Sequence, residues 1–67
     1  MPRMRLDHST VVVLLNEQGK VSAFIISTYC PPDLNRNSMA IEELRNIILS
    51  INECYQYPQI IVFSDTN

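Results

Sequence analysis

Hydrophobic residues occur in short aliphatic or β-branched runs and in one longer segment with helical spacing. The runs at residues 10–16 (TVVVLLN), 21–28 (VSAFIIST) and 59–64 (QIIVFS) are rich in β-branched residues, which favour strands. A shorter alternation of polar and apolar residues at 3–6 (RMRL) predicts a first strand that ends at Asp7. The pattern therefore predicts four strands and one helix.

The segment from Ser38 to about Gln56 predicts an amphipathic helix, because its apolar residues form one stripe at about 100° of rotation per residue. Ser38 is expected to cap the amino end, and Pro58 is expected to stop the helix. Glu42 falls opposite the stripe and should face water, whereas Glu43 falls on its edge, facing the sheet. The members of the stripe are Ala40, Leu44, Ile47, Ile48, Ile51, Cys54 and Tyr55.

Turn-forming residues separate the elements. DHST at residues 7–10 is a turn sequence, NEQGK at 16–20 contains the one glycine of the chain, and the prolines of segment 29–37 predict a loop. The element order is thus β-β-β-α-β, which predicts an α/β fold with a single domain spanning residues 1–67. We expect the first three strands to form an antiparallel meander. The helix should then carry the chain to a fourth strand that lies beside the first and parallel to it.

Composition limits the size and setting of this domain. The 67 residues are 46% hydrophobic and 18% charged, which is typical of a small globular domain that is marginal without partners. The net charge of −2 gives no basic surface for nucleic acid, although a metal-dependent nuclease site is itself acidic. Cys30 and Cys54 have no CxxC spacing and are expected to be free thiols. Without a signal peptide or a long apolar segment, we expect an intracellular protein, cytoplasmic or nuclear, with no membrane contact.

Three acidic residues fall where the predicted topology brings chain segments together. Asp7 follows the first strand, Asp65 follows the fourth, and Glu43 lies early in the helix on the side facing the sheet. Open α/β sheets place their sites at the carboxyl ends of strands. Converging carboxylates repel one another unless a cation neutralises them, and oxygen ligands suit Mg²⁺ or Mn²⁺. Two such ions about 4 Å apart can promote phosphoryl transfer. The pattern predicts a metal-dependent phosphoryl-transfer site.

The order and spacing of several short motifs resemble the ribonuclease H domain of gypsy-type retrotransposon polyproteins. That family has a DAS motif, an E-x-G-K-like turn, an S-R-x-L segment, an N-Y-S linker, an E-K-E-L-L-A-I helix and a strand ending T-D. The matching residues here are Asp7-His8-Ser9, Glu17-Gln18-Gly19-Lys20, Ser27-Thr28, Asn37-Ser38, Glu43-Leu44 with Ile47, and Ser64-Asp65. The resemblance covers nearly the whole chain.

The resemblance implies a specific activity and set of residues. Asp7, Glu43 and Asp65 match the family's catalytic acids, which would hold two Mg²⁺ or Mn²⁺ ions and hydrolyse the RNA strand of an RNA–DNA hybrid. The family's fourth acid has no counterpart here, so the chain is expected to be a ribonuclease H-like domain truncated on its C-terminal side, and such a fragment could lack activity. The rest of a polyprotein, or a second chain, is expected to cover its exposed sheet edge.

The sequence is also compatible with two alternatives. STYCPP followed by IIVFSDTN resembles the Y-x-P and G-D-x-N segments of endonuclease/exonuclease/phosphatase domains, which occur in other retrotransposons. That resemblance implies a site at Tyr29, Asp65 and Asn67, with Ser64 in place of the usual glycine. The second alternative is a non-catalytic tether or interaction module that has lost its nuclease site.

Overall fold

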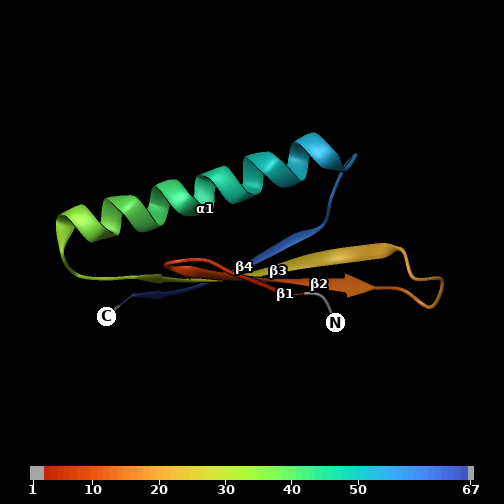
Figure 1. Ribbon diagram of the computed structural model, residues 1–67, viewed down its shortest axis with the longest axis horizontal. Coiled ribbons are helices and arrows are strands. Elements are labelled where there is room, and N and C mark those ends of the chain that lie inside the picture. The colour runs from red at the N-terminus through yellow and green to blue at the C-terminus, as the bar shows by residue number, and fades with distance from the viewer. Residues whose placement is uncertain (1–2, 67) are drawn as a thin grey trace.

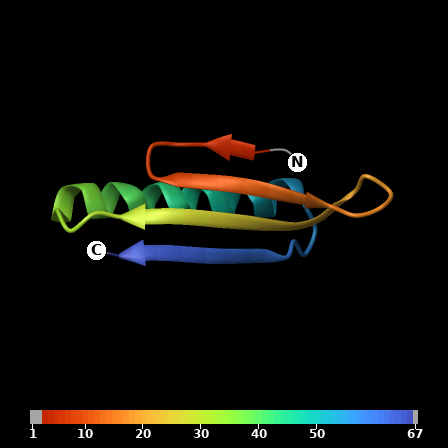
Figure 2. The same cartoon turned by 90° about the horizontal axis from the view of Figure 1, so that it is seen from below.

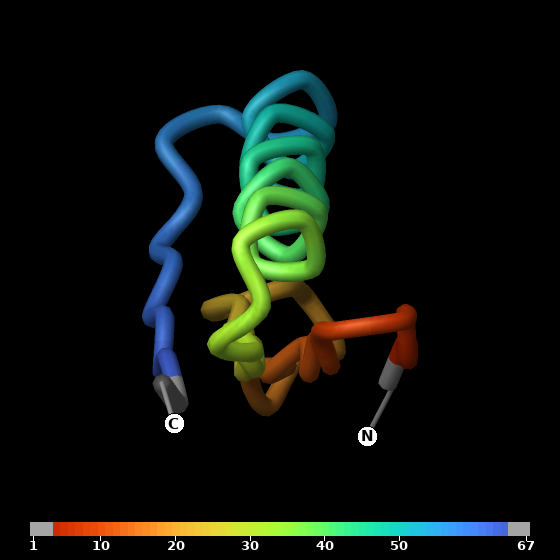
Figure 3. Tube along the Cα trace, turned by 90° about the vertical axis from the view of Figure 1, so that its left-hand side faces the viewer, coloured from red at the N-terminus to blue at the C-terminus, as the bar shows by residue number. Residues whose placement is uncertain are grey.

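The computed structural model describes the backbone of residues 3–66 and the side chains of residues 4–64. One helix covers one face of a four-stranded sheet, as Figures 1 and 3 show. The predicted order β-β-β-α-β is confirmed, and the chain is an α/β fold with a mixed sheet. The elements are β1 (Arg3–Arg5), β2 (Ser9–Leu15), β3 (Val21–Cys30), α1 (Leu34–Cys54) and β4 (Ile60–Thr66).

The pairing of the fourth strand differs from the prediction. The strand order is β1-β2-β3-β4, so β4 lies beside β3 and parallel to it, not beside β1 (Figure 2). Strand length explains this difference. β1 has only three residues, whereas β3 has ten and offers a full-length partner to the seven residues of β4. Because α1 also starts directly after β3, the shortest return of the chain leads to the free edge of β3.

The helix begins earlier than predicted. Asp33, not Ser38, is the N-cap, and its Oδ1 accepts hydrogen bonds from the backbone N–H groups of Asn35 at 2.9 Å and Arg36 at 3.1 Å. A carboxylate directly after two prolines can satisfy these free donors as soon as the chain turns. The helix ends at Cys54, two residues before the predicted end. Ser38 therefore lies exposed within the first half of the helix.

This correction gives a first prediction. Asp33→Ala should lower the free energy of unfolding by about 1 kcal/mol, because two backbone donors lose their partner. Ser38→Ala is the matched control and should change stability little, since alanine is the better helix former at an exposed position. Urea unfolding followed by circular dichroism measures both. A larger loss for Ser38→Ala than for Asp33→Ala would restore Ser38 as the cap.

The core lies between α1 and the two central strands. Val11, Phe24, Ile26 and Ile51 form a buried cluster, and the helix stripe packs against it through Leu44, Ile47 and Ile48. The predicted apolar stripe is thus confirmed in its central part, whereas Cys54 and Tyr55 at its end are exposed. The rings of Tyr55 and Phe24 still pack in a T-shaped arrangement, with their centroids 5.0 Å apart. The core fixes α1 over β2 and β3.

The β2–β3 hairpin forms at the predicted turn. Gly19 has a φ of 77°, in the left-handed region that glycine adopts without strain. The side chain of Asn16 accepts hydrogen bonds from the backbone N–H groups of Gln18 and Lys20. The turn therefore sets the register that places Val11 opposite Ile26.

Candidate functional site

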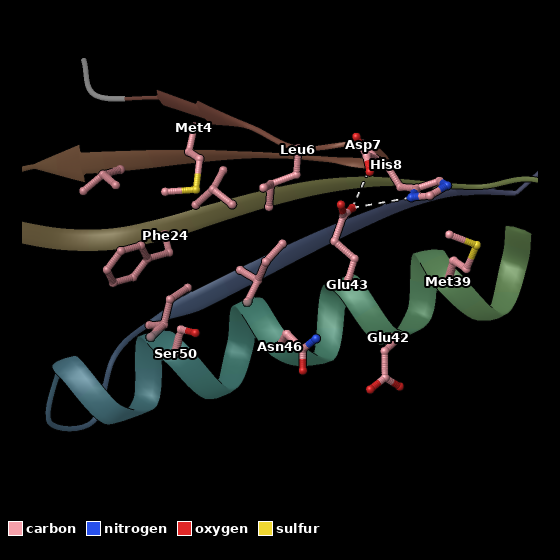
Figure 4. A pocket seen from close by; sticks show the side chains of 14 residues that line it. Met4, Leu6, Asp7, His8, Phe24, Met39, Glu42, Glu43, Asn46 and Ser50 are labelled. Carbon is pink, nitrogen blue, oxygen red and sulfur yellow. Dashed lines mark hydrogen bonds and ion pairs between the residues drawn. The ribbon is translucent and has the colours of Figure 1, made fainter.

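Glu43 joins the helix to the turn between β1 and β2. Its Oε2 accepts a hydrogen bond from the backbone N–H of His8 at 3.0 Å and lies 3.8 Å from His8 Nδ1. Figure 4 shows Glu43 pointing from α1 toward this turn, whereas Glu42 points away from the strands. The predicted orientations of the two glutamates are therefore confirmed. The carboxylate of Glu43 satisfies a backbone donor in the turn that also carries Asp7.

Tyr29 occupies the centre of the same end of the sheet. Its backbone N–H donates to the carbonyl oxygen of His8 at 2.8 Å, and on its other side Tyr29 is the parallel partner of Asp65. Beneath this row, the buried hydroxyl of Ser9 donates to Thr28 Oγ1 at 2.9 Å. The backbone of His8, just before β2, therefore lies beside that of Tyr29 on β3, which in turn lies beside that of Asp65 on β4. This is the end of the sheet where β3 and β4 both finish (Figure 2).

The three acids expected to form one cluster are distributed across this end of the sheet. Asp7 and Glu43 line the same pocket, between α1 and the β1–β2 turn. The backbone of Asp65 lies two strand spacings from that of His8, about 10 Å away, because β3 separates them. The side chain of Asp65 and the whole of Asn67 lie outside the described residues. Within the part that the structure describes, no group of three His, Cys, Asp or Glu residues could hold a metal ion.

Glu43 gives a second prediction. Glu43→Ala should lower the free energy of unfolding by about 1–2 kcal/mol in the presence of a chelator, because the His8 N–H loses a charged acceptor. Glu42→Ala is the matched control, one residue away and exposed, and should change it by less than about 0.5 kcal/mol. Chemical denaturation in EDTA measures both variants. Equal stability of the two variants would show that the Glu43 contact contributes nothing to the fold.

A groove runs between α1 and the strands β1 and β2. Its volume is about 780 Å³, and its floor is formed by buried apolar side chains of the core, among them Val11, Phe24 and Ile51. Met4 and Leu6 form its strand wall, and Met39 lies on its helix wall (Figure 4). Among the described residues, the lining includes no lysine or arginine but includes three acidic residues: Asp7, Glu42 and Glu43. Of these, Glu42 points away from the strands (Figure 4).

The sequence patterns predicted no role for the methionines of the groove. Met4 stands in the shortest strand, where three residues give little periodic signal. On the helix, however, Met39, Glu43, Asn46 and Ser50 recur at spacings of four, three and four residues. This spacing marks a second stripe beside the core stripe. The two stripes together are enough to predict the helix wall of the groove.

Comparison of the chain with protein-family models, with curated proteins and with solved structures found no match.

Cys30 and Cys54 are free thiols, as expected, with Cys30 buried and Cys54 exposed. Over residues 3–66, the one helix is not apolar enough along its length to cross a membrane.

Proposed function

We propose that this chain contributes part of a metal-dependent phosphodiesterase site of the endonuclease/exonuclease/phosphatase type. The observation that supports this proposal is the parallel, in-register pairing of Tyr29 with Asp65 at the carboxyl ends of β3 and β4. The Y-x-P and D-x-N segments stand far apart in the sequence, and this resemblance requires them to meet. A site at the carboxyl ends of adjacent parallel strands is also the usual arrangement in open α/β sheets.

The residue types of the D-x-N segment suit the chemistry. Asp65 and Asn67 offer carboxylate and amide oxygens, which are the ligands that Mg²⁺ and Mn²⁺ prefer. When bound, the metal ion would polarise the phosphate and stabilise the leaving oxygen while a water attacks phosphorus. The Tyr29 side chain is partly exposed, so its hydroxyl can hydrogen-bond to a phosphate oxygen.

The presence of Ser64 in place of the glycine of the G-D-x-N motif is compatible with this proposal. The family motif has glycine before the aspartate, whereas here Ser64 Oγ lies 3.9 Å from Cys30 Sγ across the β3–β4 pair. The extra side chain thus packs beside a buried thiol on the neighbouring strand. Glu43, which this resemblance leaves without a catalytic role, acts instead as the acceptor for the β1–β2 turn.

The ribonuclease H assignment is the second candidate, and one observation favours it. Asp7 and Glu43 line one pocket, as two catalytic acids of that family should. The strand order weighs against it, because a fourth strand beside the first would have brought Asp65 next to Asp7. In the observed sheet, β2 and β3 lie between β1 and β4.

Substrate choice tests the proposal. The chain is incubated with Mn²⁺ and either supercoiled plasmid DNA or an end-labelled RNA–DNA hybrid, with EDTA as the blank. We expect nicking of the plasmid that EDTA abolishes. Cleavage confined to the RNA strand of the hybrid would overturn the proposal in favour of the ribonuclease H assignment. A folded chain that cleaves neither substrate would favour the tether or interaction module.

A further inference from the structure

We infer that the groove between α1 and the β1–β2 segment binds a basic amphipathic helix of a partner protein. This inference goes beyond the proposed function and does not depend on it. It rests on the shape of the groove, on the residue types of its walls, and on the charge around its rim.

The dimensions of the groove suit an elongated ligand. Its helix wall extends from Met39 to Ile51, which corresponds to about 18 Å along α1. That length matches about twelve residues of a second helix, or slightly more than three turns. Apolar side chains at positions i, i+4 and i+7 of such a helix would point toward the floor formed by Val11, Phe24 and Ile51.

The walls present adaptable apolar side chains to solvent. Met4 and Met39 are 59% and 60% exposed, and Leu6 is 37% exposed. Methionine is unbranched and polarizable, so it fits irregular apolar partners, and it is enriched at surfaces that bind helices. Exposed apolar residues clustered on one face of a small domain indicate an interaction surface.

The charged residues around the groove indicate what charge its partner should carry. Asp7 and Glu43 contribute two carboxylates at the end near the β1–β2 turn, and Glu42 adds a third on the side of α1 that points away from the strands (Figure 4). Among the described residues that line the groove, none is lysine or arginine. Among the described residues of the groove, His8 is the one group that can carry positive charge, and its Nδ1 lies 3.8 Å from Glu43 Oε2. A helix with lysine or arginine flanking its apolar stripe is complementary to this rim, whereas an acidic helix would be repelled.

A peptide titration tests the inference with the 67-residue chain. The probe is a fluorescein-labelled 14-residue helix of leucine and lysine, and its counterpart carries glutamate in place of every lysine. Fluorescence anisotropy should show binding of the lysine peptide at least about tenfold tighter than that of the glutamate peptide. Equal affinity for the two peptides, or binding of neither, would overturn the inference.

Variants locate the binding surface. Met39→Asp should weaken binding of the lysine peptide by about tenfold, because it places a charge on the apolar wall. Leu34→Asp adds the same charge on the same helix, at a residue that is 84% exposed and does not line the groove, and should leave binding unchanged. Equal effects of the two variants would overturn the inference. Self-association that Met39→Asp abolishes would overturn it as well, by assigning the groove to a second copy of the chain.

Discussion

Replacing Asp65 with asparagine is expected to lower the proposed Mn²⁺-dependent cleavage by about 100-fold or more. A carboxylate ligand to a catalytic metal contributes several kcal/mol to the transition state, and each 1.4 kcal/mol corresponds to a factor of about ten in rate. Substitution of Tyr29, the backbone partner of Asp65, should also lower the cleavage rate. Tyr29→Phe removes only the hydroxyl and should lower the rate by about tenfold. Initial rates of plasmid nicking, with folding checked by circular dichroism, measure both effects.

Asp7→Asn and Glu43→Gln provide the matched controls. Both change a carboxylate to an amide at the same end of the sheet, so they test whether any loss of negative charge there affects cleavage. The proposed site of Tyr29, Asp65 and Asn67, called here the β3–β4 site, predicts cleavage rates within about twofold of the wild type for these variants at a temperature where they remain folded. Loss of cleavage in Asp7→Asn and Glu43→Gln, with activity retained in Tyr29→Phe, would support the ribonuclease H assignment instead.

Replacing Ile26 with alanine is expected to unfold most of the chain. Ile26 has no exposed surface, pairs with Val11 on β2 and Val62 on β4, and belongs to the core cluster with Ile51. Removing three buried carbons costs about 2–5 kcal/mol, because a cavity remains where the side chain packed. A single core in a domain of this size supplies only about 3–5 kcal/mol of net stability. The far-ultraviolet circular dichroism spectrum should therefore lose its helical signal.

Two milder substitutions test whether the loss of core packing causes this unfolding. Ile26→Val removes one methylene and should cost about 0.5–1.5 kcal/mol, which leaves the chain folded. Leu34→Ala shortens an apolar side chain that is 84% exposed and should change stability by less than about 0.5 kcal/mol. Urea unfolding ranks the three variants. A folded Ile26→Ala variant with the stability of Leu34→Ala would contradict the central position of Ile26.

The strands, the helix and the hairpin turn could be predicted from the sequence, because each forms from residues that are close together along the chain. Runs of β-branched residues predicted β2 and β3, and the helical spacing of apolar residues predicted α1. Gly19 and Asn16 indicated the hairpin turn. The orientations of Glu42 and Glu43 followed from the same helical geometry. The predicted start of α1 was wrong, because Asp33 and Ser38 are both residue types that cap helices well. Only the position of the chain after the two prolines decides between them.

The position of β4 could not be predicted from periodicity. Period-two alternation tells which residues share a face of a strand, but not which neighbouring strand it will pair with. That choice depends on the length of the available edges, and the short β1 leaves β3 as the better partner. The ribonuclease H site required β4 beside β1, so its grouping of Asp7 with Asp65 rested on this pairing. The alternative site required only that Tyr29 and Asp65 lie on neighbouring strands.

Paramagnetic broadening by Mn²⁺ tests the location of the metal site most directly, because it needs no catalysis. Titration of the ¹⁵N-labelled chain with substoichiometric Mn²⁺ should first broaden the amide signals of residues 28–30 and 64–66. Mg²⁺ in excess should restore them, since both ions would share the same oxygen ligands. Broadening centred on Asp7, His8 and Glu43 instead would contradict the β3–β4 site and place the metal beside the β1–β2 turn.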